Sequence, residues 1–117
     1  MQSGEDYLEA ILVLHKRIDM VRSVDVARHM EVSKPSVCHA VGILREGGFL
    51  TMDEEHYLHL TDIGREVAVK IYERHCFFME QLIAAGVDPK IAEADACRLE
   101  HVISSESFER LKETADQ

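Results

Sequence analysis

The sequence has no tryptophan, two prolines and three cysteines, and aromatic residues make up only 6% of its 117 positions. No apolar run is long enough to span a bilayer, and the N-terminus lacks the basic and apolar segments of a secretory signal. The odd cysteine count, without paired spacing, argues against a disulfide framework and favours a reducing compartment. We therefore expect a cytoplasmic protein with no membrane partner.

Signatures of common enzyme classes are also missing. The chain contains no His-Glu-x-x-His pair, no nucleophile elbow and no glycine-rich phosphate loop. A hydrophobic fraction of 46% with 30% charged residues is that of an ordinary globular domain. We therefore expect a folded protein that is not an enzyme.

The charge is unevenly distributed. The whole chain carries −9, yet residues 15–45 carry +3, so the remainder carries −12. A strongly acidic protein ordinarily does not bind nucleic acid, but one locally basic segment leaves DNA binding open. Because the net charge of the whole chain is negative, we expect a single copy to bind DNA poorly and two copies to be needed.

Hydrophobic periodicity predicts a mostly α protein with six helices and one short hairpin. The hairpin pairs residues 49–52 with 57–60 across a polar turn. The residues predicted to cap the helices are, in chain order, Ser3, Ser23, Ser33, Thr61, Asp88 and Ser104 or Ser105.

The first three helices and the hairpin follow the order of a winged helix-turn-helix. Residues 24–37 fit the two-helix pattern, with small Ala27 where the helices cross, although Glu31 occupies a turn position that is often glycine. A protein-binding module would have the same order, and the local basic excess favours DNA. The predicted DNA-binding residues are Arg28, Ser33, Lys34, Pro35, Ser36 and His39.

A second pattern indicates a metal site. Cys97, Glu100 and His101 are spaced to lie on one helical face, and thiolate, carboxylate and imidazole together suit a divalent transition metal. Asp6 and Glu9 share a face of the first helix. Each residue alone also has a structural interpretation, as a small buried thiol or a solvated carboxylate, so spacing does not join the two groups.

Three strings in the chain join them. The segment 93–104, together with Glu5-Asp6-Tyr7-Leu8-Glu9 and Arg74-His75, resembles the DtxR/MntR family of iron- and manganese-dependent repressors. This resemblance implies an N-terminal winged helix-turn-helix domain, residues 1–73, followed by an all-α metal-binding and dimerisation domain, residues 74–117. Iron-type members often continue into an SH3-like domain after the sixth helix, so we expect from this sequence the shorter, manganese-type architecture.

The resemblance also implies the metal ligands. Asp6 is typical of the manganese branch, whereas cysteine at the position of Cys97 is common in the iron branch. Glu93 stands where iron-type members place a histidine of a second site, and Met79 where a carboxylate often supports it. The full implied set is Asp6, Glu9, His75, Glu93, Cys97, Glu100 and His101.

The function implied is that of a metal-dependent repressor. Mn²⁺ or Fe²⁺ would act as co-repressor, with Co²⁺ or Zn²⁺ substituting in vitro, and would order a homodimer on a palindromic double-stranded DNA operator of metal homeostasis genes. The alternative is a DNA-binding regulator that responds to a non-metal ligand.

Overall fold

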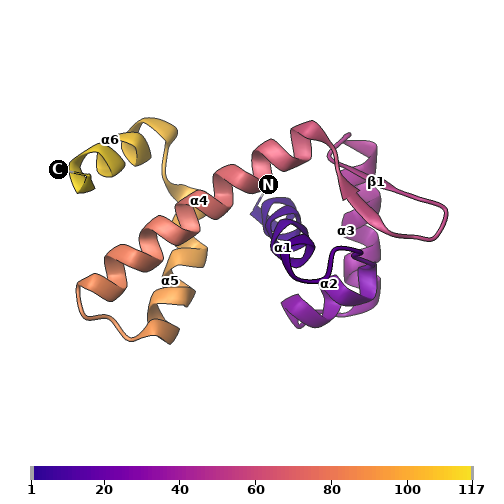
Figure 1. Cartoon of the computed structure of the whole chain (residues 1–117), viewed down its shortest axis with the longest axis horizontal. Coiled ribbons are helices and arrows are strands. Elements are labelled where there is room, and N and C mark those ends of the chain that lie inside the picture. Colours follow the sequence, from indigo (N-terminus) through magenta and orange to yellow (C-terminus); the bar gives the residue numbers. More distant parts are fainter. Residues whose placement is uncertain (1, 117) are drawn as a thin grey trace. The chain divides into compact units, whose positions relative to one another are not determined.

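The computed structural model describes residues 2–116, and their side chains from residue 4 onward. The chain divides into two compact units, residues 1–69 and 70–117 (Figure 1). The division falls within one continuous helix, which also contains the 73/74 boundary expected from sequence. Over the described residues, no helix has the length and apolarity needed to cross a membrane.

The predicted architecture, mostly α with one small hairpin, is confirmed. The elements of the described chain are α1 (Gln2–Ile18), α2 (Ser23–Met30), α3 (Lys34–Glu46), β1 (Leu50–Met52), β2 (Leu58–Leu60), α4 (Asp62–Ala84), α5 (Pro89–Val102) and α6 (Ser105–Ala115).

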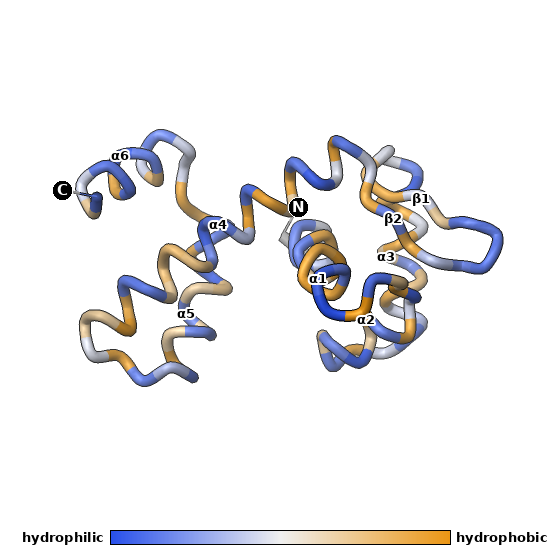
Figure 2. The backbone as a smooth tube through the Cα atoms, in the orientation of Figure 1, coloured by the Kyte–Doolittle hydropathy of each residue, from blue (hydrophilic) through white to orange (hydrophobic). Residues whose placement is uncertain are grey.

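The first unit is built around one apolar core. Ile11 of α1, Val26 of α2 and Val37 of α3 are completely buried there. Leu50 and Leu58 of the hairpin close the same core, and the apolar stretches of α1 stand out in Figure 2. Because α1 contacts α2, α3 and β2, it is the element that holds the helix-turn-helix and the hairpin together.

The turn between α2 and α3 requires an unusual backbone conformation. Glu31 has φ 57°, in the left-handed region that favours glycine. Val32 then donates its N–H to the carbonyl of Ala27 at 3.1 Å. The departure from glycine noted in the sequence therefore leaves the turn intact.

Two predicted helix caps were wrong. Helix α1 already begins at Gln2, so Ser3 lies inside it. Helix α2 includes Ser23, and Arg22 is the extended N-cap residue. The cause is Asp25, whose carboxylate accepts the Arg22 backbone N–H at 2.9 Å.

The other predicted caps are confirmed. Each side chain accepts a backbone N–H of the first turn, which otherwise lacks an intrahelical partner. The caps are Ser33 for α3, Thr61 for α4, Asp88 for α5 and Ser104 for α6.

One acidic side chain organises the hairpin turn. Asp53 accepts the backbone N–H groups of Glu55 at 3.0 Å and Tyr57 at 2.9 Å, and lies 2.9 Å from His59 Nε2. The hydrogen bond from His59, and then that from Tyr57, lower the pKa of Asp53. The turn stays ordered without the Asn-Gly pair that short hairpins commonly use.

The hairpin is fastened to the end of α1. The ring of His15 lies with Nδ1 2.8 Å from the Asp19 carbonyl and Nε2 3.0 Å from the Leu58 carbonyl. Leu58 in turn donates its N–H to the Val21 carbonyl at 2.7 Å. These bonds fix the hairpin relative to the three helices of the unit.

The second unit has a smaller, aromatic core. Phe78 of α4, Ala96 of α5 and Phe108 of α6 are buried together, and Phe77 and Met79 pack against them. Phe77 meets Phe108 edge-on with ring centroids 5.4 Å apart, a favourable geometry for aromatic pairs. Met79 therefore belongs to the core of this unit.

A close contact at the start of α4 makes Gly64 irreplaceable. A Cβ at Gly64 would lie against the Phe49 carbonyl oxygen, whereas a Cβ at Gly42 of α3 would meet open space. We expect Gly64→Ala to destabilise the protein by about 2 kcal/mol or more. Gly42→Ala, the matched control, should stabilise it by up to about 1 kcal/mol because alanine favours helix. Urea unfolding measures both, and equal effects would contradict this packing.

Candidate metal centre and DNA-binding surface

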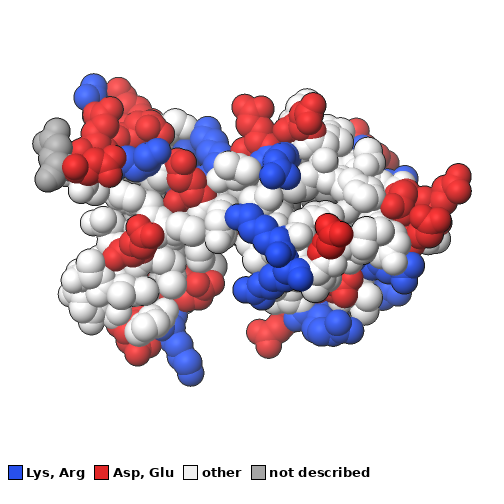
Figure 3. Space-filling model, viewed as in Figure 1, with Lys and Arg blue, Asp and Glu red and all other residues white. Residues whose placement is uncertain are grey.

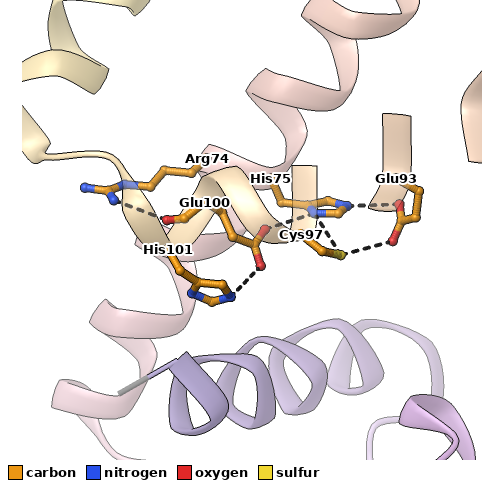
Figure 4. A network of polar contacts seen from close by, with 6 residues as sticks. All are labelled: Arg74, His75, Glu93, Cys97, Glu100 and His101. Carbon is orange, nitrogen blue, oxygen red and sulfur yellow. Dashed lines mark hydrogen bonds and ion pairs between the residues drawn. The ribbon is translucent and has the colours of Figure 1, made fainter. Parts of the chain in front are cut away.

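A buried arginine fixes the end of α5. Arg74 of α4 donates through Nη1 to the carbonyl of Glu100 at 3.2 Å (Figure 4). The same Nη1 donates to the carbonyl of Ile103 at 2.7 Å. Its Nη2 donates to Ser105 Oγ at 3.2 Å. The last carbonyls of a helix lack intrahelical donors, so the guanidinium of Arg74 supplies the missing hydrogen-bond donors. These bonds hold α4, α5 and α6 together at this point.

His75, the next residue, lies among three side chains of α5. Its Nδ1 is 2.9 Å from Glu100 Oε2 and 3.9 Å from Cys97 Sγ. Its Nε2 is 3.1 Å from Glu93 Oε2. One potential ligand atom each from His75, Cys97 and Glu100 lie within 4.8 Å of one another. The structure therefore brings together these predicted residues from two helices.

The Glu100 carboxylate is the unusual group of this cluster. It is fully buried, and its Oε1 has no hydrogen-bond donor among the described residues. His101 Nε2 lies 3.2 Å from that oxygen, within ion-pair distance but outside hydrogen-bond geometry. Buried carboxylates are normally paired or bound to a metal. An incompletely satisfied oxygen beside imidazoles and a thiol therefore fits a divalent transition-metal ion.

The same surroundings hold a proton on His75. The hydrogen bond with Cys97, followed by that with Glu100, raises the pKa of His75 to about 11 despite partial burial. The ring is therefore an imidazolium at neutral pH in the metal-free protein. Metal ligands must be deprotonated, so a metal ion at this position displaces that proton.

Two further predicted ligands come from the other unit. Asp6 and Glu9 belong to α1, in the first unit. Their approach to the cluster on α4 and α5 stays a prediction from the resemblance. Met79, which stands where other family members often have a carboxylate, packs against the aromatic core.

The predicted DNA-binding residues are all exposed in the first unit. Ser33 also caps α3, where its hydroxyl lies 2.8 Å from that of Ser36. The Arg28 side chain is 76% exposed and lies 3.8 Å from Asp25. In Figure 3, basic side chains gather over the helices of this unit, whereas acidic ones gather at the tip of the hairpin.

Sequence reasoning missed the role of Arg74. The Arg74-His75 string was used only as a family signature, yet the guanidinium is buried and also lies 5.4 Å from the Phe108 ring centre. The only sequence signal was an arginine at a core-facing position of a long amphipathic helix. Its partners are backbone carbonyls 26 and 29 residues away, which no side-chain pattern reveals.

Two family models together span the chain. The iron dependent repressor N-terminal DNA binding domain matches residues 1–60, and the iron dependent repressor metal binding and dimerisation domain matches residues 61–117. The chain belongs to the iron-dependent repressor family. It is a family of metal-dependent transcriptional regulators, and it is the family that the three sequence strings resembled.

Individual proteins that are similar to this chain in sequence or structure are also regulators or repressors by name. The transcriptional regulator MntR of Salmonella typhimurium is 34% identical over 105 residues, covering 90% of this chain and 67% of that protein. The manganese regulator SloR superposes with a TM-score of 0.87 at 27% identity, over 97% of this chain. A manganese-dependent transcriptional repressor in complex with manganese gives 0.83 at 26% identity, over 95% of this chain. The chain spans about half the length of these two solved structures.

The protonation of His75 is open to measurement without metal. Because its pKa of about 11 exceeds the ordinary 6.5, the protonated ring stabilises the metal-free fold fully below pH 6.5. This contribution is lost as the pH rises through about 11. In an NMR titration of the metal-free protein, we expect Cys97→Ser and Glu100→Gln each to lower this pKa. An unchanged midpoint in both variants would contradict the described geometry.

Proposed function

We propose that this chain is a transcriptional repressor that uses a divalent metal ion, Mn²⁺ or Fe²⁺, as co-repressor. The observation that carries the proposal is the buried Glu100 carboxylate, whose Oε1 lacks a hydrogen-bond donor among the described residues beside His75, Cys97 and His101. Family membership supports it, as do solved relatives described as manganese regulators.

The ligand set follows from position and chemistry. His75, Cys97, Glu100 and His101 come from the second unit, and Asp6 and Glu9 of the first unit complete the site, as the resemblance implies. Carboxylate oxygens suit Mn²⁺ and Fe²⁺, while a thiolate at Cys97 favours Fe²⁺, Co²⁺ or Zn²⁺. When bound, the ion supplies positive charge that compensates carboxylates from both units.

Helix α1 would transmit metal binding to DNA binding. Asp6 and Glu9 lie on the helix that contacts α2, α3 and β2 within the first unit. Carboxylates held at the metal site would restrain this helix and, through its shared core, the orientation of the recognition helix α3. A protein already restrained in its DNA-binding arrangement loses less conformational freedom when it binds.

The DNA contacts would come from the start of α3. Lys34, Ser36 and His39 are exposed there, beside the N–H groups of a helix N-terminus that attract phosphate. The acidic tip of the hairpin (Figure 3) repels phosphate, so the helices carry the favourable charge. Arg28 on α2 adds to them.

Two copies would bind a palindromic operator together. Helix-turn-helix dimers read half-sites about one helical turn apart, and the net charge of −9 makes a single copy a poor DNA ligand. Exposed Ile91 and Val102 of α5 offer apolar surface for the second copy. We place this activity in the cytoplasm, and the relatives' role as transcriptional regulators favours regulation over catalysis.

The central test is metal-dependent DNA binding. We expect Mn²⁺ or Fe²⁺ to tighten binding to the region upstream of the protein's own gene by tenfold or more, about 1.4 kcal/mol. Fluorescence anisotropy of metal-stripped, anaerobic protein measures this. Glu100→Gln and His101→Ala should lose the response, while Asp95→Asn on the same helix should keep it. Binding that ignores both ions and a chelator would overturn the proposal and indicate a regulator with a non-metal ligand.

The DNA surface has a separate test. Lys34→Ala should weaken metal-activated binding to every DNA sequence and reduce the slope of log affinity against log salt by about 1. Its affinity for metal should stay unchanged, because Lys34 belongs to the other unit from the α4–α5 cluster. Lys90→Ala, an exposed lysine of α5, is the matched control. Equal losses in the two variants would show that α3 is not the DNA contact.

A further inference from the structure

We propose that Glu93 is a positioning residue that holds the Nε2–H of His75, so that Nδ1 is the nitrogen presented to the metal. This inference rests on the proposed metal-dependent function and deepens it. It replaces the direct ligand role that the sequence predicted for Glu93.

The two ring nitrogens face different surroundings. Nδ1 faces Glu100 Oε2 at 2.9 Å and Cys97 Sγ at 3.9 Å, within the group of converging ligand atoms. Nε2 faces Glu93 Oε2 at 3.1 Å, and Figure 4 shows Glu93 at the opposite end of the ring from Glu100. Glu93 is outside the converging group.

The chemistry of imidazole makes this arrangement directional. A neutral ring carries one proton, and the nitrogen without it binds the metal. A carboxylate can only accept a hydrogen bond, so Glu93 would hold the remaining proton on Nε2 once the metal, together with Glu100 and Cys97, takes Nδ1. Such pairing of a carboxylate with a metal-binding histidine fixes the ring and raises its basicity. The His75 side chain is only 15% exposed, so neighbouring atoms also restrict its rotation.

Glu93 also contacts the thiol ligand. Cys97, one helical turn further along α5, donates through Sγ to Glu93 Oε1 at 3.7 Å. One carboxylate therefore orients two of the proposed ligands, His75 through Oε2 and Cys97 through Oε1. Because the Glu93 side chain is 55% exposed, its substitution leaves the buried core unchanged.

Two substitutions separate positioning from ligation. Glu93→Gln keeps an oxygen that accepts Nε2–H, whereas Glu93→Ala removes it. For a positioning residue, we expect alanine to lower metal affinity about 10- to 100-fold, as loss of a hydrogen-bond partner of a ligand does. Glutamine should stay within about threefold of the original chain, since the hydrogen bond persists.

Zn²⁺ serves as the probe because it is diamagnetic. Its affinity is measured by competition with a chelating dye, and ¹⁵N-histidine NMR of the Zn²⁺-loaded protein identifies the bound nitrogen. In the original chain and in Glu93→Gln we expect Zn²⁺ on Nδ1 of His75 and a proton on Nε2. In Glu93→Ala the Nε2–H signal should be lost to exchange. Asp95→Asn, two positions along α5 and on another helical face, should match the original chain in both measurements.

Three results would overturn the inference. Equal losses for glutamine and alanine would make Glu93 a ligand, and no loss for either would make it a solvated surface residue. Coordination of His75 through Nε2 would contradict the assigned orientation. If the unsubstituted chain binds no Zn²⁺, the proposed function fails with it. In the first three results the unsubstituted chain still binds metal, so the proposed function survives.

Discussion

The second unit depends on the burial of one carboxylate. Glu100 is fully buried, and burying a charge costs several kcal/mol unless partners compensate it. His75 contacts one of its oxygens at 2.9 Å, and Arg74 holds its backbone carbonyl at 3.2 Å. Both partners come from consecutive residues of α4. These adjacent residues have different roles. Arg74 donates to the carbonyls at the end of α5, whereas His75 contacts the Glu100 carboxylate.

The first unit meets a different constraint, the need to keep small elements in one arrangement. The two strands have three residues each, and α1 supplies the contact that α2, α3 and β2 share. Hydrogen bonds of His15 to Asp19 and Leu58 extend that contact to the hairpin. A displacement of α1 would therefore also displace the helices and the strand that it contacts. A switch in which ligands on α1 control a recognition helix requires such shared contacts.

Local chemistry explains which sequence predictions were confirmed. Ser33, Thr61, Asp88 and Ser104 each precede a helix directly, and their bonds reach only two or three residues. The Ser23 cap was wrong because Asp25, three residues after Arg22, captured the Arg22 N–H. Both outcomes depend on hydrogen bonds of the same short range. The spacing of Cys97, Glu100 and His101 was likewise a property of one helix.

The sequence by itself determined the helices, the helix-turn-helix order, the family and the residue types at the candidate site, because these follow from periodicity, caps and short strings. Only the tertiary structure decided that Arg74 reaches the carbonyls of Glu100 and Ile103, and that His75 turns its two nitrogens toward different carboxylates. Those contacts join α4 to α5 across 18 to 29 residues. The packing of the Phe78–Ala96–Phe108 core brings these residues together in space. Side-chain spacing along a single helix does not encode that packing.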